Sequence, residues 1–283
     1  MQLLDGKALS EKIKNSLKNE SERLVKQGVT PCLAVILVGE DPASQTYVNS
    51  KEKSSHASGI SSIVKRLPST TSEKELLSLI NTLNNDATVD GILVQLPVPK
   101  HIDSTKIIEA IDPRKDVDGF HPFNVGRLVA GLDGFVPCTP FGVMKLLEEY
   151  NISVRGMDAC VIGASNIVGK PMMNLLLNAS ATVEICRSST RNLKEHTLKA
   201  DLIVVGVGKP NLLTADMVKE GAIVIDVGIN RTSEGKIVGD VDFANVAPKC
   251  SYITPVPGGV GPMTIAMLLA NTVKSAKQRL ASL

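Results

Sequence analysis

Short apolar runs alternate with amphipathic stretches along most of this chain, and the alternation predicts a parallel α/β protein. Each run has the length of a strand and is nearly continuous in apolar residues, as expected for strands covered on both faces. The predicted strands are 32–38, 60–67, 91–96, 159–162, 182–186, 202–206 and 222–227. The predicted helices are 9–26, 43–57, one that starts at the capping box Ser72/Glu75, 140–150, 172–177, 193–199, 215–219 and 264–280.

A polar stretch at 113–134 has no clear period, is expected to be a loop, and separates two series of alternating elements. We therefore predict the α/β class, with two three-layer α/β domains and an active-site cleft between them. The first domain is 1–138, and the second, 139–263, has the element order of a Rossmann-like dinucleotide-binding domain. The last helix, about 264–283, is expected to pack back on the first domain.

Composition excludes several classes of function. Lys plus Arg number 31 against 29 Asp plus Glu, so the chain lacks the charge excess of a protein that binds nucleic-acid phosphates. No apolar run reaches the length of a membrane span, and the first residues lack a signal-peptide core. The five cysteines form no C-x-x-C pair and the four histidines share no ligand spacing, which favours reduced thiols, no metal and a cytoplasmic location.

The first candidate for chemistry is the segment 159–171, where an apolar strand ends in a G-x-S-x-x-x-G turn before a helix. Such a turn presents backbone N–H groups at a helix N-terminus to a phosphate, although an ordinary strand–helix turn explains it equally well. The next strand ends in Arg187, Ser188 and Ser189. A guanidinium and hydroxyls suit a 2′-phosphate and so favour NADP, unless Arg187 only forms a surface salt bridge.

A second candidate lies after the first strand. Ser44, Tyr47 and Lys51 share one helix face at the carboxyl end of that strand, where open α/β sheets bind ligands. They could orient a substrate or stabilise negative charge, but spacing alone favours a solvated face. Gln95 interrupts an apolar strand, and its amide must find a partner when buried. Lys51 is a plausible partner, and a purely structural glutamine is the alternative.

Two loops complete the candidates. Asp116 and Asp118 precede Gly119, and a carboxylate there could accept two hydrogen bonds from an amino-pyrimidinone edge. The alternative is an Asx turn before the glycine. The segment 255–264 is so rich in Gly and Pro that a flat ligand could approach its backbone closely, although it could also be a rigid linker.

Together these segments resemble the bifunctional methylenetetrahydrofolate dehydrogenase/methenyltetrahydrofolate cyclohydrolase family, in its short bacterial form. The resemblance covers essentially the whole chain and keeps the order of the family's motifs. The segments that carry it are PASQTYVNSK (42–51), DGILVQLPVP (90–99), KDVDGFHPFNVG (115–126), PCTPFG (137–142), VIGASNIVGKP (161–171), IVIDVGINR (223–231) and ITPVPGGVGPMT (253–264).

The resemblance implies roles for individual residues. Tyr47 stacks on the aminobenzoyl ring of folate, and Lys51 is the principal catalytic group of the hydrolytic step. Gln95 binds Lys51 and tunes its charge, and Asp118 anchors the pterin. The other implied folate contacts are Leu96, Pro97, Pro257, Gly258, Gly259 and Pro262, and the implied dinucleotide contacts are Gly163, Ala164, Ser165, Ile167, Arg187, Ser188 and Ile229.

The implied reactions are oxidation of 5,10-methylenetetrahydrofolate by NADP and hydrolysis of the methenyl product to 10-formyltetrahydrofolate. A homodimer and one-carbon metabolism in the cytoplasm are also implied. Many animal relatives have Arg where Ala164 stands, which leaves Arg187 as the better partner for the 2′-phosphate. The alternatives are another NADP-linked dehydrogenase of the shikimate type, a non-enzymatic dinucleotide sensor, or a monofunctional family member. The last is disfavoured because Lys51 and Gln95 are both present.

Overall fold

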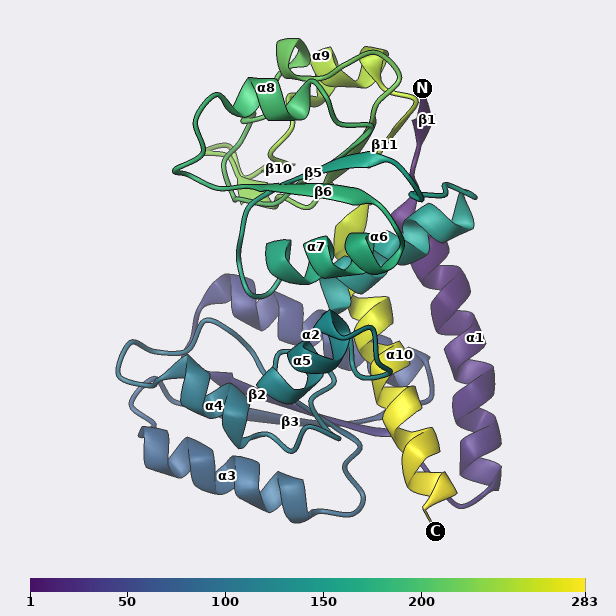
Figure 1. Cartoon of the computed structure of the whole chain (residues 1–283). Coiled ribbons are helices and arrows are strands. Elements are labelled where there is room, and N and C mark those ends of the chain that lie inside the picture. Colours follow the sequence, from purple (N-terminus) through teal and green to yellow (C-terminus); the bar gives the residue numbers. More distant parts are fainter. Residues whose placement is uncertain (283) are drawn as a thin grey trace. The chain divides into compact units, whose positions relative to one another are not determined.

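A computed structural model describes residues 1–282, and the chain divides into two compact units. Unit 1 consists of Met1–Glu11 and Pro137–Thr264, and unit 2 of Lys12–Val136 together with the chain from Ile265 onward. The first eleven residues therefore belong with the later part of the chain, whereas the sequence analysis left them in the N-terminal domain. The colours of Figure 1 follow this path through both units.

Unit 1 is built on a six-stranded parallel sheet with the order β1-β11-β8-β7-β5-β6. Successive strands are added on opposite sides of β5, with β6 on one side and β7 on the other, as in Rossmann-like folds. Its strands are β1 (Gln2–Leu3), β5 (Asp158–Ile162), β6 (Thr182–Cys186), β7 (Leu202–Val205), β8 (Ile223–Asp226) and β11 (Tyr252–Ile253). The short hairpin of β9 (Asn230–Arg231) and β10 (Ile237–Val238) follows β8.

Helices cover both faces of this sheet, and Figure 1 shows α8 and α9 on the face opposite α6 and α7. One face packs Ile203, Val205 and Val224 against Leu213 and Val246, and all five are buried. The helical elements are α6 (Cys138–Glu149), α7 (Gly169–Asn178), α8 (Leu193–Thr197), η1 (Ala215–Met217), α9 (Phe243–Val246) and η2 (Ala247–Lys249). The predicted three-layer α/β arrangement is thus confirmed for this unit.

Unit 2 contains a three-stranded parallel sheet with the order β3-β2-β4. The central strand β2 (Cys32–Val38) is buried at every position, while the edge strand β3 (Ser61–Leu67) is partly exposed. β4 (Gly91–Val94) completes the sheet. The helices are α2 (Pro42–Ala57), α3 (Glu73–Asn85), α4 (Ser104–Ala110) and α5 (Pro122–Val129), together with most of α1 (Gly6–Lys26) and of α10 (Val260–Ala281).

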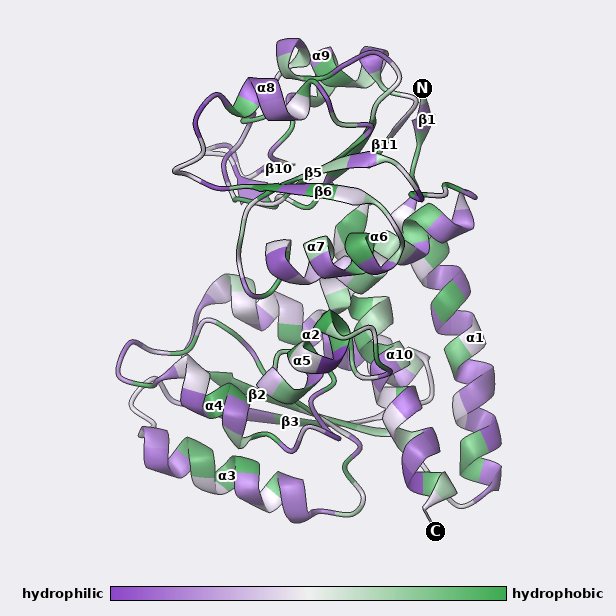
Figure 2. Cartoon of the chain, viewed as in Figure 1, coloured by the Kyte–Doolittle hydropathy of each residue, from purple (hydrophilic) through white to green (hydrophobic). Residues whose placement is uncertain are grey.

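The core of unit 2 follows the strand period. Ala34 and Ile36 of β2 share a buried cluster with Leu76 and Ile80 of α3 and Ile107 of α4. The predicted capping box begins α3, because the Ser72 hydroxyl accepts from the Glu75 amide and the Glu75 carboxylate accepts from the Ser72 amide. The polar and apolar stripes of α3 are visible in Figure 2.

The last helix is tied into unit 2 by polar contacts as well as by burial. The Asn271 side chain donates to the carbonyls of Val117 and Val136, and the Ser275 hydroxyl donates to the Asp90 carbonyl. The Arg279 guanidinium forms two hydrogen bonds to the Asp90 carboxylate, at 2.8 and 3.0 Å. These contacts fix the helix to the residue before β4 and to the segments on either side of α5.

Several predicted elements were wrong in detail. The predicted loop 113–134 contains α5, which has only eight residues and therefore too few turns to show a period. The helix α4 was missed for the same reason. The predicted helix 215–219 is a single 3-10 turn, and the predicted strand 91–96 ends at Val94. The strands β1 and β11 have two residues each, so only their pairing defines them.

Candidate active site

In unit 2 the candidate catalytic side chains Tyr47 and Lys51 belong to helix α2. The helix begins where Asp41 accepts a 2.7 Å hydrogen bond from the Ser44 amide, with Pro42 in the first turn. Its buried residues are Ser44, Val48, Lys51 and Ser55, which lie on one face at helical spacing. Lys51 is only 8% exposed, so the prediction that this helix face is solvated was wrong at Lys51.

Lys51 and Gln95 form the predicted pair. The Lys51 Nζ donates to the Gln95 Oε1 at 2.9 Å, and the Gln95 Nε2 donates to the Leu96 carbonyl at 2.8 Å. The Gln95 backbone amide donates to Ile36, so this residue continues the β4 ladder onto β2. Because the amide NH₂ is committed to the backbone, the oxygen is held toward the lysine. An oxygen acceptor can bind the amine in both of its protonation states.

Tyr47 lies one turn before Lys51 on α2 and is 37% exposed. Burial of part of its ring raises the pKa of the phenol, so the hydroxyl stays protonated at neutral pH. The residue therefore offers a flat neutral ring with a hydrogen-bonding tip. Leu96 and Pro97, which follow Gln95, are joined by a cis peptide bond.

The two aspartates of the 115–126 segment have different environments. Asp116 is 1% exposed and accepts hydrogen bonds from the amides of Phe120 and His121 and from the Asn124 side chain. Burial raises its pKa to about 7. This carboxylate therefore holds the loop together, through bonds to residues four, five and eight positions further on and not through the bond two residues on that defines an Asx turn. Asp118 is only partly buried, so it is the better candidate for contact with a ligand.

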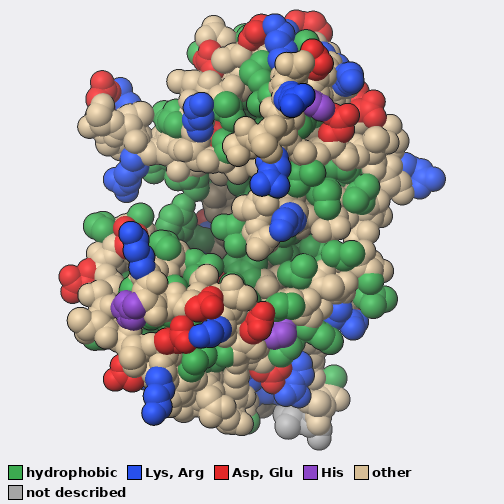
Figure 3. Space-filling view, turned by 60° about the vertical axis from the view of Figure 1, so that its left-hand side comes forward, with side chains coloured by type: hydrophobic (Ala, Val, Ile, Leu, Met, Phe, Trp, Pro, Cys, Tyr) green, Lys and Arg blue, Asp and Glu red, His purple; other side chains and the backbone are tan. Residues whose placement is uncertain are grey.

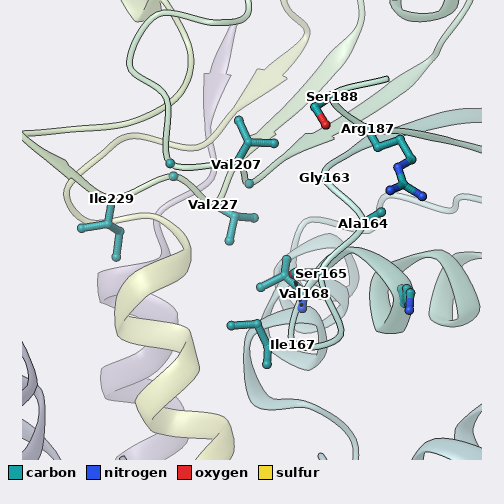
Figure 4. A pocket seen from close by; sticks show the side chains of 14 residues that line it. Gly163, Ala164, Ser165, Ile167, Val168, Arg187, Ser188, Val207, Val227 and Ile229 are labelled. Carbon is teal, nitrogen blue, oxygen red and sulfur yellow. Dashed lines mark hydrogen bonds between the residues drawn. The ribbon is translucent and has the colours of Figure 1, made fainter. Parts of the chain in front are cut away.

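Unit 1 has a pocket of about 700 Å³ at the carboxyl ends of its parallel strands. The lining residues follow β5, β6, β7 and β8, which is where a Rossmann-like sheet binds its ligand. They are Gly163, Ala164, Ser165, Ile167, Val168, Lys170, Arg187, Ser188, Gly206, Val207, Gly208, Val227, Gly228 and Ile229. All seven predicted dinucleotide residues are among them, and Figure 4 shows Arg187 beside Ala164, with Ile229 on the opposite side of the view.

The wall after β5 is shaped by glycine. Gly163 has φ +115°, and a Cβ there would lie 2.6 Å from the Gly206 carbonyl oxygen. A Cβ on Gly169 would lie 1.8 Å from the Gly163 carbonyl oxygen, so the first turn of α7 packs directly on the preceding turn. The Ser165 hydroxyl accepts from the Val168 amide at 3.1 Å. This close backbone packing makes the turn one wall of the pocket, and binding of a phosphate there stays a prediction.

Arg187 and Ser188 are exposed at the end of β6. The turn is held by the Arg187 amide, which donates to the Thr190 hydroxyl, and by the Thr190 amide, which donates to the Arg187 carbonyl. Glu184 pairs instead with His196 at 2.7 Å. No carboxylate therefore lines the described pocket, whereas an NAD site would use an Asp or Glu side chain to hold the ribose hydroxyls.

The segment 255–264 is fixed within unit 1. Gly258 has φ +106°, and its carbonyl accepts from the Lys7 amide at 2.8 Å. A Cβ on Gly6 would lie 1.8 Å from the Gly259 carbonyl oxygen, so α1 begins in close contact with this loop. Pro257, Gly258, Gly259 and Pro262 thus belong to unit 1, while Tyr47, Lys51, Gln95 and Asp118 belong to unit 2.

The sequence analysis missed the pocket residues after β7 and β8. These are Gly206, Val207, Gly208, Val227 and Gly228. Val227 and Gly228 lie in the motif IVIDVGINR (223–231), whereas no motif covers 206–208. Their position directly after two parallel strands of the same sheet was the available signal, because such strand ends meet at one edge.

Two family models match the chain. One is described as "Tetrahydrofolate dehydrogenase/cyclohydrolase, catalytic domain" and matches residues 4–118, and the other as "Tetrahydrofolate dehydrogenase/cyclohydrolase, NAD(P)-binding domain" and matches residues 137–280. The chain belongs to the tetrahydrofolate dehydrogenase/cyclohydrolase family. The resemblance drawn from the sequence is thereby confirmed.

Individual members of the tetrahydrofolate dehydrogenase/cyclohydrolase family match over almost the full length. "Bifunctional protein FolD" of Nitratiruptor sp. is 67% identical over 280 residues, which cover 99% of each chain. The solved bifunctional enzyme FolD from Campylobacter jejuni is 63% identical with a TM-score of 0.98, covering 99% of both chains. The Trypanosoma brucei enzyme, solved with NADP cofactor and an inhibitor, is 36% identical with a TM-score of 0.94, covering 98% of this chain and 97% of that one.

Membership of this family replaces the alternative of a shikimate-type dehydrogenase. The solved shikimate 5-dehydrogenase of Thermus thermophilus is 12% identical with a TM-score of 0.54, covering 87% of this chain and 99% of that one. A likeness at that level shows a shared fold alone.

The described part of the chain adds two negative findings and one on its surface charge. Within residues 1–282, no group of three or more His, Cys, Asp or Glu side chains could hold a metal ion. Every helix in this range is too short or too polar to cross a membrane. Figure 3 shows basic and acidic side chains interspersed over the face it presents, in line with the near-zero net charge.

Proposed function

We propose that this chain oxidises 5,10-methylenetetrahydrofolate with NADP⁺ and then hydrolyses the methenyl product to 10-formyltetrahydrofolate. Both activities follow from the family, whose two domain models match successive parts of the chain. The observation that carries the proposal is the hydrogen bond of the buried Lys51 to Gln95, which lies in the part matched by the catalytic-domain model.

We propose that Lys51 is the catalytic group of the hydrolytic step. Water attack on the methenyl carbon creates negative charge and requires proton movement, and a buried amine can serve either need. Gln95 fixes the position of the Nζ, because its oxygen is oriented by the bond from its own NH₂ to Leu96. The glutamine therefore positions the lysine in either protonation state.

Tyr47 and Asp118 are proposed to hold the folate. The neutral ring of Tyr47 suits stacking on the aminobenzoyl group, and Leu96 and Pro97 add apolar contact nearby in the chain. The carboxylate of Asp118 can accept two hydrogen bonds from the pterin edge. Pro257, Gly258, Gly259 and Pro262 are proposed as further folate contacts on the resemblance to the family.

We propose that the pocket of unit 1 binds NADP. Gly163, Ala164, Ser165 and Ile167 would lie along the dinucleotide, with Ile229 on the opposite wall. Arg187 and Ser188 supply the cation and hydroxyl that suit a 2′-phosphate. When bound, the nicotinamide supplies the hydride acceptor, and the part of this chain is to place the folate methylene carbon against it.

Homodimer formation and a cytoplasmic location are also proposed, and the resemblance to the family alone supports them. Sedimentation of the purified chain tests the first.

The test of the function compares Lys51→Met with Lys53→Met, a change of an exposed lysine on the same helix. We expect Lys51→Met to lose at least about 100-fold in methenyl hydrolysis, the usual contribution of a positioned proton-transfer group. Lys53→Met should retain both activities. Full hydrolysis by Lys51→Met would contradict the assignment, and methylene oxidation that is faster with NAD than with NADP would contradict the cofactor.

A further inference from the structure

Asp240 is a fully buried carboxylate between β10 and α9, with 0% exposure, and it does not line the dinucleotide pocket. It accepts hydrogen bonds from the backbone amides of Val207, Gly208 and Lys209, at 2.6, 3.0 and 2.8 Å. The side chain of Asn230 adds a fourth, at 2.8 Å. All four donors are neutral amides.

Two of these donors line the pocket, and the other two each directly follow a residue that lines it. Val207 and Gly208 line it directly after β7. Asn230 follows Ile229, which lines it after β8. One carboxylate therefore holds both strand-end segments at a fixed separation. Three successive amides that converge on one anion form a nest, and hydrogen bonds to a charged acceptor are stronger than those between neutral groups.

A second buried carboxylate, that of Asp226, accepts a hydrogen bond from the backbone of Asp240. Asp226 ends β8, is 3% exposed, and accepts from the amides of Gly228, Asp240 and Val241 at 2.9 to 3.0 Å. A Cβ on Gly228 would lie 2.3 Å from the Asp240 Cγ, so the pocket wall packs directly on this carboxylate. The position of Asp240 is thus set from both its backbone and its side chain.

We propose that Asp240 is a positioning residue for the dinucleotide: it sets the affinity for the part of the ligand that lies between the walls after β7 and β8, without touching it. The inference rests on the proposed binding of NADP in this pocket. Figure 4 shows Ile229 on the opposite side of the view from Arg187, with Val207 between them. If Arg187 holds the 2′-phosphate, the walls held by Asp240 surround the nicotinamide half.

The substitution Asp240→Asn keeps the volume of the side chain and removes an acceptor. Oδ2 accepts from Val207 and Gly208, and Oδ1 accepts from Lys209 and Asn230. In either orientation of the new amide, its NH₂ faces at least one backbone N–H of the 207–209 turn. The turn must then move, and the wall of the pocket moves with it.

The experiment measures the Kd of two ligands by calorimetry on the full chain: NADP, and adenosine 2′,5′-bisphosphate, which carries only the 2′-phosphate half. For Asp240→Asn we expect NADP to bind about ten-fold more weakly, the equivalent of one charge-assisted hydrogen bond, with the bisphosphate affinity changed by less than about two-fold. Asp242→Asn is the matched control, because that half-buried carboxylate accepts from Asn245 in α9. It should bind both ligands as the unchanged chain does.

Unchanged NADP affinity in Asp240→Asn overturns the inference, and so does equal weakening of both ligands, which would indicate general damage to the unit. If Asp240→Asn does not fold, Asn230→Ala decides, since it cuts the link to the β8 wall and leaves the three backbone bonds. Weaker NADP binding with normal bisphosphate binding supports the inference, and unchanged NADP binding contradicts it. Failure of the unchanged chain to bind NADP would instead contradict the proposed function.

Discussion

The ion pair between Asp90 and Arg279 is expected to be the most costly polar contact to break in unit 2. Arg279 lies in the last turn of α10, and its side chain is 25% exposed, while that of Asp90 is 1% exposed. The guanidinium bonds both carboxylate oxygens, and the Cys32 amide donates to one of them at 2.9 Å. Arg279→Met would leave a buried carboxylate with one amide donor.

Breaking a buried pair by removing one partner costs about 3–5 kcal/mol of unfolding free energy. The partial exposure of Arg279 and the remaining Cys32 amide favour the lower end, about 3 kcal/mol. For a chain of 283 residues that loss corresponds to a fall in Tm of about 5 °C. Urea denaturation followed by circular dichroism measures the free energy, and a thermal scan measures Tm.

The matched control is Lys277→Met, on the same helix. Lys277 pairs with Glu20 at 2.7 Å, but the two side chains are 53% and 35% exposed. An exposed pair contributes about 0–1 kcal/mol, so this variant should be nearly as stable as the unchanged chain. The double variant Asp90→Asn/Arg279→Met should recover most of the loss, because a neutral amide can still accept from Cys32.

The pH dependence gives a second check. Burial raises the pKa of Asp90, and Arg279 opposes that rise, so removing the arginine raises the pKa further. The folded variant then binds a proton more readily than the unfolded chain, and its deficit should shrink as the pH falls. A deficit equal to that of Lys277→Met, or one that does not change between pH 8 and pH 5, would refute the reasoning.

Three further predictions concern the loop, a helix cap and the cofactor. Burial raises the pKa of Asp116 from its usual 3.8 to about 7. Its contribution to the free energy of unfolding should therefore fall by about 4 kcal/mol between pH 4 and pH 7 and stay constant above pH 7. Urea titrations of Asp116→Asn at several pH values should lack this fall in stability. Ser72→Ala removes the capping box with Glu75 and should cost about 1 kcal/mol in the same assay, and no loss would refute the cap. Arg187→Ala should raise the KM for NADP at least about ten-fold and leave that for NAD unchanged, whereas an equal effect on both would refute the 2′-phosphate contact.

Local sequence patterns determined the elements with many residues of one period. The run at 32–38 is apolar at every position because β2 is covered on both faces. A capping box and a regular apolar stripe indicate α3 in the sequence. The pairing of Lys51 with Gln95 was also foreseeable, because a polar residue inside an apolar strand requires a partner. The family motifs also indicated seven residues that line the pocket of unit 1.

Only the tertiary structure decided the features that depend on distant parts of the chain. Residues 1–11 join unit 1 because β1 pairs with β11, and a strand of two residues has no pattern of its own. Asp116 and Asp118 are two residues apart and alike in sequence, but Asp116 is 1% exposed and bonded by Asn124 of α5, whereas Asp118 is only partly buried. Asp240 acquires its role from amides more than thirty residues earlier. Burial and hydrogen-bond geometry are properties of the packed chain, and sequence spacing does not carry them.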